Sequence, residues 1–205
     1  MTGYREHVIP IPNIDTVVGS RHLDKDALLA IINPQKYPVA TMDQIHHNSI
    51  HHIQSHSNAI IPKTDALMTD IPDQWIGVKT ADCLPILLYH PKPAIAIIHA
   101  GRKGSILNIT AETLSKMTQC YGHADTITAY FGPAICQTCY DIGPKQYFDL
   151  VAENKSQIQA ICPNAKILGG KTCTSCQHQD FYSYRKGDLK HRQWCFMQIR
   201  DQKEP

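Results

Sequence analysis

Residues 79–104, KTADCLPILLYHPKPAIAIIHAGRKG, contain two apolar runs joined by a turn. The runs cover 84–89 and 94–98, each the length of a buried strand, and the second is rich in β-branched isoleucine. The Pro-Lys-Pro segment between them does not fit a helix at that spacing. We therefore predict a pair of buried strands that forms the scaffold of the fold.

Polar side chains stand at the ends of both predicted strands. Asp82 and Cys83 come before the first strand, and His99 ends the second. Arg102 and Lys103 follow directly and are flanked by glycines. Reactive groups at strand ends, beside glycines that allow close backbone approach, indicate a functional site on a rigid scaffold.

Length and charge set the broad class. The chain has 205 residues, a length typical of one domain with its own core, so we predict a single domain over 1–205. Its formal net charge is only +2 and its Lys and Arg residues are dispersed, so we expect neither nucleic acid nor a membrane as a partner. No stretch approaches the roughly 18 apolar residues of a spanning helix, and the polar N-terminus does not resemble a signal peptide, so we expect a cytoplasmic protein.

Cysteine and histidine are the unusual residues, with 8 and 12 copies. Eight cysteines in a small secreted protein would indicate disulfides, but this chain is long for that class and shows no export signal. We therefore expect reduced thiols, some of them metal ligands.

Periodicity predicts both strands and helices along the chain. An amphipathic helix is expected over 105–120, and its first N–H groups would face the same end of the sheet as His99, which suits an anion. The other expected helices are 25–32 and 146–153, and the expected strands are 8–11, 16–18, 41–46, 65–69, 75–78 and 127–131, with a turn at 167–170 and 189–199 as a helix or a strand.

A histidine-rich tract lies between positions 46 and 56. On a strand over 41–46, Gln44 and His46 would point to the same side. Such a tract also fits loose metal binding or a solvated loop, and spacing alone selects no ligand from it. Its members are His46, His47, His51, His52 and His56.

Cys83 and His99, with one further histidine, would form a three-ligand zinc site that keeps a position open for water or substrate. A buried inert thiol and a hydrogen-bonded histidine explain the same residues. A third interpretation makes Cys83 a nucleophile and His99 its base, oriented by Asp82 or Gln44.

Two Cys-x-x-Cys motifs stand in the second half of the chain, Cys136/Cys139 and Cys173/Cys176. Paired motifs of this kind are typical of structural zinc, although the 33 residues between them exceed the roughly 15–20 of most four-cysteine sites. Scattered buried thiols are the alternative.

Several short motifs between about 41 and 185 resemble, in order, those of the YfiH-type laccase-domain family. Its members were first called polyphenol oxidases and are now regarded as purine nucleoside phosphorylases with adenosine deaminase side activity. The motifs are Gln44-Ile45-His46, Thr64-Asp65-Ala66-Leu67, Thr80-Ala81-Asp82-Cys83-Leu84-Pro85, His99-Ala100-Gly101, Gly132-Pro133-Ala134-Ile135, Cys139-Tyr140 and Phe181-Tyr182-Ser183-Tyr184-Arg185.

The resemblance implies an α/β fold of layered mixed sheets flanked by helices, with the site in a cleft. It implies a zinc site, rather than a copper site, formed by His46, Cys83 and His99. In the implied reaction phosphate attacks C1′ of a purine nucleoside and releases the base; for deamination, a zinc-bound hydroxide attacks C6 of adenosine. The residues implied for substrate or phosphate are Arg21, Gln44, Arg102 and Lys103.

The chain departs from the family pattern at Arg102-Lys103, where the family has Trp-Arg. An aromatic wall is thereby lost, and a point charge replaces a bidentate guanidinium. Two alternatives to the zinc-dependent phosphorylase therefore stay open. One is a Cys/His hydrolase or amidase with Cys83 as nucleophile, and the other is a metal-binding homologue that has lost catalysis.

Overall fold

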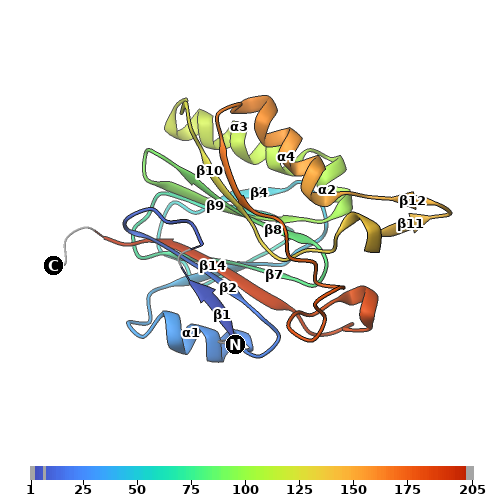
Figure 1. Cartoon of the computed structure of the whole chain (residues 1–205). Coiled ribbons are helices and arrows are strands. Elements are labelled where there is room, and N and C mark those ends of the chain that lie inside the picture. The colour runs from blue at the N-terminus through green and yellow to red at the C-terminus, as the bar shows by residue number, and fades with distance from the viewer. Residues whose placement is uncertain (1–2, 7, 202–205) are drawn as a thin grey trace.

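Two six-stranded mixed sheets stacked face to face form the centre of the molecule, and helices cover their outer faces (Figure 1). The computed structural model describes residues 3–6 and 8–201. Four layers result, in the order helix, sheet, sheet, helices. The expected α/β class with layered mixed sheets is confirmed.

The helices are α1 (Lys25–Ile32), α2 (Arg102–Ile106), α3 (Ile109–Tyr121) and α4 (Leu150–Ile161), with 3₁₀ turns η1 (Gln137–Cys139) and η2 (Tyr184–Lys186). The strands are β1 (Tyr4–Glu6), β2 (Ile14–Gly19), β3 (Val39–Met42), β4 (Ile50–His52), β5 (Ile60–Ile61), β6 (Ala66–Thr69), β7 (Trp75–Thr80), β8 (Leu84–His90), β9 (Ala94–Ala100), β10 (Thr128–Phe131), β11 (Asp141–Gly143), β12 (Gln146–Tyr147), β13 (Lys166–Gly169) and β14 (Gln193–Ile199). The two large sheets have the orders β1-β2-β14-β7-β3-β5 and β13-β10-β8-β9-β6-β4, and β11 and β12 form a separate pair.

The predicted strand pair is the antiparallel hairpin β8–β9, in the middle of the second sheet. All seven residues of β9 are buried, because both faces of this sheet are covered. Ile95 and Ile97 pack into the core between the sheets, whereas Ala96 and Ile98 belong to the core under the helices. Burial on both faces explains why the run is continuously apolar rather than alternating.

The helices cover the two outer faces with different cores. Residues of α3 and α4 pack on the second sheet in the larger of these cores. On the first sheet, Leu28 of α1 packs against Val17, Trp75 and Phe196. None of the helices in the described part of the chain is long and apolar enough to cross a membrane.

Several expected elements differ from those in the structure. The helix expected over 105–120 is two helices, α2 and α3, because Asn108 between them adopts a left-handed conformation with φ of 60°. Residues 8–11 form no strand. The strand expected over 41–46 ends at Met42, so that Gln44 and His46 lie in a loop.

The remaining differences are in the second half of the chain. The helix expected over 146–153 begins only at Leu150, where Asp149 caps it by accepting a hydrogen bond from the backbone N–H of Ala152. The first three residues of the turn expected at 167–170 belong to strand β13, which pairs in parallel with β10. The segment 189–199 contains a strand, β14, rather than a helix.

Candidate functional site

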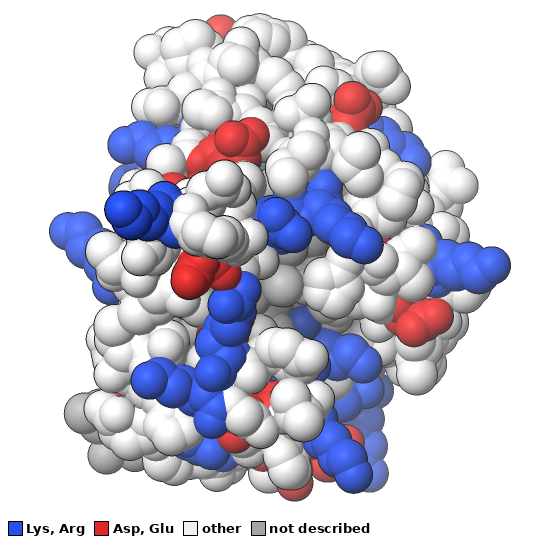
Figure 2. All heavy atoms as spheres, turned by 90° about the vertical axis from the view of Figure 1, so that its right-hand side faces the viewer, with Lys and Arg blue, Asp and Glu red and all other residues white. Residues whose placement is uncertain are grey.

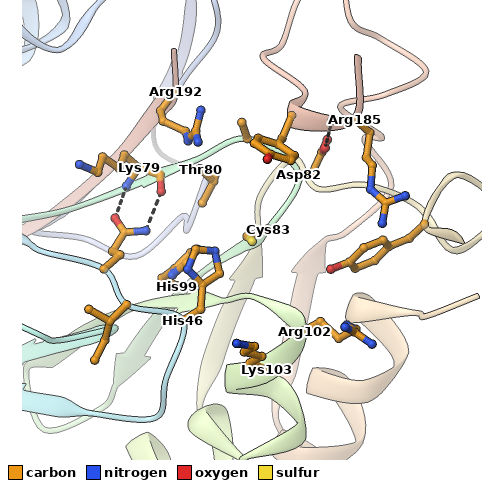
Figure 3. A pocket seen from close by; sticks show the side chains of 15 residues that line it. His46, Lys79, Thr80, Asp82, Cys83, His99, Arg102, Lys103, Arg185 and Arg192 are labelled. Carbon is orange, nitrogen blue, oxygen red and sulfur yellow. Dashed lines mark hydrogen bonds between the residues drawn. The ribbon is translucent and has the colours of Figure 1, made fainter. Parts of the chain in front are cut away.

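Three of the predicted residues lie together at one end of the second sheet. The ligand atoms of His46, Cys83 and His99 are all within 4.8 Å of one another, and the two imidazole rings meet edge to face at 4.7 Å (Figure 3). Cys83 directly precedes β8 and His99 lies near the end of β9, so the antiparallel hairpin brings them to the same end of the sheet. His46 reaches the same point from the loop that follows β3.

A buried carboxylate, Asp65, holds the two histidines in place. It has no exposed surface and accepts hydrogen bonds from the backbone N–H groups of Ile45, His46 and His47 at 2.9–3.2 Å. Its Oδ1 also lies 2.7 Å from Nδ1 of His99. When Nδ1 donates to Asp65, Nε2 of His99 faces the other ligands. Metal-binding histidines are commonly oriented in this way by a carboxylate on the other ring nitrogen.

Close packing around the three ligand residues depends on a glycine. A Cβ atom at Gly101 would lie 3.0 Å from the ring of His46 and 3.1 Å from Sγ of Cys83. His46 and Asp82 have left-handed φ angles of 59° and 82°. Non-glycine residues in this region cluster at functional sites, where the surrounding contacts hold them.

The prediction that Asp82 or Gln44 orients His99 was wrong. Asp82 does not face His99, because its two carboxylate oxygens accept hydrogen bonds from the Thr174 hydroxyl and the Arg185 backbone N–H. Gln44 is occupied as well, since its side-chain amide donates to and accepts from the backbone of Lys79. Asp65 takes the orienting position instead.

The pKa values of Cys83 and His99 are shifted in opposite directions. Burial raises the pKa of Cys83, but the charge of His99 and hydrogen bonds to both histidines outweigh it and lower the pKa from 9.0 to about 6. Burial lowers the pKa of His99, but the Cys83 thiolate and the Asp65 hydrogen bond raise it to about 9. Both shifts favour a thiolate on Cys83 beside an imidazolium on His99 in the metal-free site, and a metal ion would take the place of the proton on Nε2.

A cavity of about 610 Å³ opens beside this group. Five cationic side chains line it, against one acid, Asp82, whose oxygens already accept hydrogen bonds. On the face that lies to the right in Figure 1, Lys and Arg side chains surround a hollow (Figure 2). Such a concentration of positive charge attracts an anionic ligand. The five are Lys79, Arg102, Lys103, Arg185 and Arg192.

The predicted phosphate residues are only partly brought together. Arg102 and Lys103 line the cavity from α2, and Gln44 lines it too. Arg21 is not among the residues that line it. The guanidinium of Arg21 lies over the ring of Tyr182, donates to the carbonyl of His178 and forms an ion pair with Asp188 at 3.2 Å.

Four residues of the site were not predicted as site residues from the sequence. Asp65 stands at the start of a predicted strand, so the strand-end criterion that selected Cys83 could have found it. Arg185 ends one of the recognised motifs, but nothing local showed that its backbone would bond Asp82 from 103 positions away. Lys79 and Arg192 carried no signal in the sequence.

The remaining histidines of the tract lie elsewhere. His47 offers its backbone N–H to Asp65. His52 lies 2.8 Å from the hydroxyl of Tyr121, and His56 is 2.9 Å from the carbonyl of Pro72. Within the described residues, the tract therefore contributes one imidazole, that of His46, to the three-residue group.

Two imidazoles and a thiolate beside an open cavity fit a zinc ion. Catalytic zinc takes three nitrogen, sulfur or oxygen donors from the protein and keeps a position for water or substrate. Asp65 supplies the carboxylate behind His99 that such sites need. The donors are present, and the cavity lies on the side where a ligand would enter.

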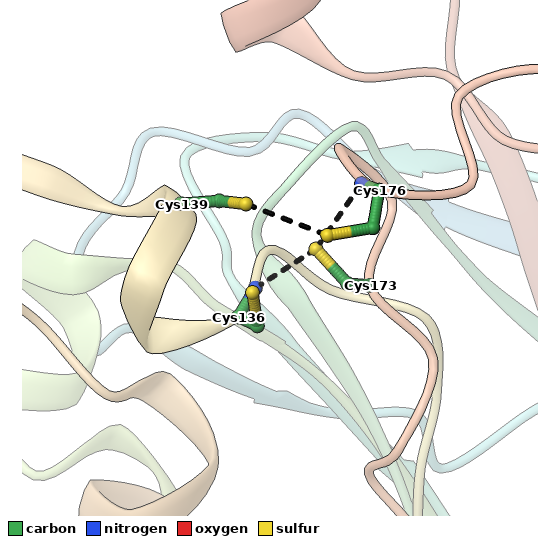
Figure 4. A group of neighbouring side chains, drawn as sticks. All are labelled: Cys136, Cys139, Cys173 and Cys176. Carbon is green, nitrogen blue, oxygen red and sulfur yellow. Dashed lines mark hydrogen bonds between the residues drawn. The ribbon is translucent and has the colours of Figure 1, made fainter.

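A second group of potential metal ligands lies outside this cavity lining. We call it the four-cysteine group, and its sulfur atoms are all within 4.8 Å of one another (Figure 4). The structure thus brings together the two Cys-x-x-Cys motifs. Its members are Cys136, Cys139, Cys173 and Cys176.

We expect the thiol of Cys83 to react with iodoacetamide at unusually low pH. In metal-free protein the alkylation rate should be half-maximal near pH 6, because His99 stabilises the thiolate, whereas an ordinary thiol is half-ionised at about pH 8.5. Peptide mass spectrometry separates Cys83 from the other cysteines. His99→Gln should move the midpoint upwards, and an unchanged midpoint in that variant would contradict the assigned cause.

Comparison with known proteins gives a consistent result. The family model described as "Multi-copper polyphenol oxidoreductase laccase" matches residues 21–161. An adenosine deaminase of an unknown prokaryotic organism is 31% identical over 154 residues, which are 62% of this chain and 59% of that protein. A purine nucleoside phosphorylase of Campylobacter jejuni is 31% identical over 166 residues, 74% of this chain and 73% of that protein. The match thus spans less than two thirds of the first relative's length.

Solved structures share the fold. A crystal structure of a Neisseria meningitidis protein superimposes with a TM-score of 0.83 at 22% identity, covering 98% of this chain and 100% of that one. The Bacillus licheniformis hypothetical protein YfiH gives a TM-score of 0.79 at 20% identity, with the same coverage. At this identity the likeness establishes the fold.

Proposed function

The chain belongs to the family described as multi-copper polyphenol oxidoreductase laccase, and we propose that it is a zinc-dependent purine nucleoside phosphorylase. In this proposal residues 1–205 act as a single catalytic domain, and adenosine deamination is a second activity of the same site. The substrates are a purine nucleoside and phosphate, as the names of the relatives suggest.

The observation that carries the proposal is the meeting of two features in one cavity. The group of His46, Cys83 and His99 forms part of the wall, and five cationic side chains form much of the rest. A volume of about 610 Å³ is within the range of small-molecule sites. A dianionic co-substrate such as phosphate accounts for the cations, and a neutral nucleoside fits the space beside them.

In this reaction an oxygen of phosphate forms a bond to C1′ of the ribose, and the C1′–N9 bond breaks, leaving its electron pair on the purine. Arg102 and Lys103 project from α2 and would hold phosphate as the nucleophile. Arg185 faces them from η2 and would neutralise charge on the same anion. Zinc bound by the three-residue group would supply a Lewis acid that draws electron density from a substrate oxygen.

Two tyrosines in the cavity wall would position the base. Tyr140 and Tyr184 line the cavity, and the guanidinium of Arg185 lies 5.2 Å from the centre of the Tyr140 ring. Aromatic faces bind purines by stacking without demanding one particular base. In deamination, water takes the place of phosphate, attacks C6 of adenosine, and ammonia leaves.

Zinc rather than copper is the metal that we propose. A His₂Cys set also occurs in blue-copper sites, where a long axial ligand completes a closed centre. Here the three ligand residues line an open cavity together with cationic side chains. The fourth coordination position of a bound ion could therefore face substrate, which suits a Lewis acid.

The test combines metal analysis with two assays on the purified chain. We expect bound zinc, release of hypoxanthine from inosine that requires phosphate, and slower release of ammonia from adenosine. His46→Ala, which removes one donor, should abolish both reactions. Bound zinc with neither reaction would overturn the proposal and favour the homologue that has lost catalysis.

One observation favours a second function, a Cys/His hydrolase or amidase. Cys83, His99 and Asp65 form a thiolate, imidazolium and carboxylate series, the arrangement of an activated cysteine nucleophile. Under this alternative a substrate-like electrophile would label Cys83 of metal-free protein that is fully active. Under the proposed function, metal-free protein is inactive.

Lys103→Arg is expected to raise the catalytic efficiency with phosphate by about 3- to 10-fold. A planar guanidinium binds two oxygens of phosphate in parallel, whereas an ammonium acts as a point charge. The gain should appear in KM for phosphate rather than in KM for inosine. Lys92→Arg, at an exposed site outside the cavity lining, is the matched control and should change neither. An unchanged KM for phosphate in Lys103→Arg would place the anion elsewhere.

A further inference from the structure

We infer that the four-cysteine group holds one structural zinc ion, which cross-links two loops of the cavity wall. The loops are 132–141, which includes η1 and the first residue of β11, and 170–186, which ends with η2. This site is separate from the His46, Cys83 and His99 group, and its occupancy does not depend on the proposed function.

The geometry of the sulfur atoms suits a single ion. All four lie within 4.8 Å of one another, and Sγ of Cys139 and Sγ of Cys176 are 3.5 Å apart. Zinc–sulfur bonds of about 2.3 Å in a tetrahedron place neighbouring sulfurs roughly 3.8 Å apart. An iron–sulfur cluster would need wider spacing, because its cysteines bind different iron atoms. An all-sulfur tetrahedral donor set is typical of structural zinc.

Backbone N–H groups already point at one of the four sulfur atoms, that of Cys173. The backbone N–H groups of Cys136 and Cys176 both donate to Sγ of Cys173, at 3.3 and 3.4 Å (Figure 4). Hydrogen bonds of this kind orient and stabilise metal-bound thiolates. An inert core thiol does not explain the group, because Cys176 is exposed and Cys136 and Cys139 are only half-buried.

The fold accounts for the long interval between the two motifs. Strands β10 and β13 pair in parallel, and the connection between them contains η1, β11, β12 and α4. Parallel neighbours need such a crossover of a dozen or more residues. Each Cys-x-x-Cys motif follows the C-terminal end of one of these parallel strands, so both motifs lie at the same end of the sheet. There Ala134 and Cys173 form a parallel bridge that anchors the loops to each other.

The two loops carry residues that face the cavity. Tyr140 follows Cys139 directly, and its ring lies 5.2 Å from the guanidinium of Arg185. Thr174, inside the second motif, donates its hydroxyl to Asp82 next to Cys83, at 2.7 Å. Arg185 also donates to the carbonyl of Asp141 at 2.7 Å. An ion that joins the motifs would therefore fix this wall of the cavity without touching the substrate.

The main test is metal analysis of the variant C136S/C176S. We expect it to contain one zinc ion per chain fewer than the wild type, whatever the other site holds, and to unfold at a temperature lower by about 5 °C or more. Hydrogen exchange should become faster in 132–141 and 170–186. Cys120→Ser, an exposed cysteine outside the group, is the matched control and should change none of these.

A second measurement uses a protein with the four cysteines intact, in case the double variant does not fold. In Cys83→Ala protein, titration of the thiols with an organomercurial should release zinc to an indicator dye. Equal zinc contents in wild type and C136S/C176S would overturn the inference. So would release of iron instead of zinc, or disulfides within the four-cysteine group of freshly purified protein.

Discussion

Cys83→Ala protein is expected to contain one zinc ion per chain fewer than the wild type and to lose phosphorolysis. The variant removes the only thiolate among three donors whose ligand atoms lie within 4.8 Å of one another. Two imidazoles alone hold zinc weakly at an open site. The loss of activity should exceed the roughly 10- to 100-fold caused by removing a residue that only hydrogen-bonds to a metal ligand.

Metal analysis and the phosphate-dependent inosine assay measure the two effects on the same sample. Cys120→Ala, at an exposed cysteine, is the control for a lost thiol and should match the wild type in both. Zinc retained in Cys83→Ala with activity lost would make Cys83 a nucleophile and favour the hydrolase. Retention of both would move the site away from this group.

Asp65→Asn is expected to lower both zinc affinity and stability. The carboxylate accepts four hydrogen bonds with no exposed surface, whereas an amide nitrogen in its place is a donor and leaves some of those N–H groups unsatisfied. The ring of His99 also loses the partner that directs Nε2 towards the metal. We expect about 3 kcal/mol less unfolding free energy, a melting temperature lower by roughly 6–12 °C, and zinc affinity lower by roughly 10- to 100-fold.

Calorimetry and competition with a zinc chelator give the two numbers. Asp43→Asn, a nearby exposed carboxylate, is the matched control and should change neither.

The unfolding free energy of the wild type should also depend on pH in the acid range. Burial raises the pKa of Asp65, but the bonds from His99 and the backbone outweigh it and lower the pKa below 3.8. This stabilisation is present above that usual value and is lost as the pH falls through the lower folded value, a dependence that Asp65→Asn should lack.

Much of the fold was predictable because it depends on local pattern. The hairpin β8–β9 was evident from two apolar runs and a Pro-Lys-Pro turn, and α1 was predicted with its observed bounds. Errors came where a local pattern met a longer-range constraint. The single helix expected over 105–120 breaks at Asn108, and the strand over 41–46 stops at Met42 because Asp65 binds three backbone N–H groups of the following loop.

The sequence by itself determined the buried hairpin of residues 79–104 and the reactive groups at its ends. Hydrophobic burial is recorded in the order of neighbouring residues, so that part needs no knowledge of distant contacts. Resemblance to a family added His46. Tertiary structure alone decided that Asp65 orients His99, that Arg185 joins the cavity while Arg21 does not, and that four cysteines meet. Those contacts join residues far apart in the chain. The pairing of β6 with β9 places Asp65 beside His99, and the pairing of β10 with β13 brings the two cysteine motifs together.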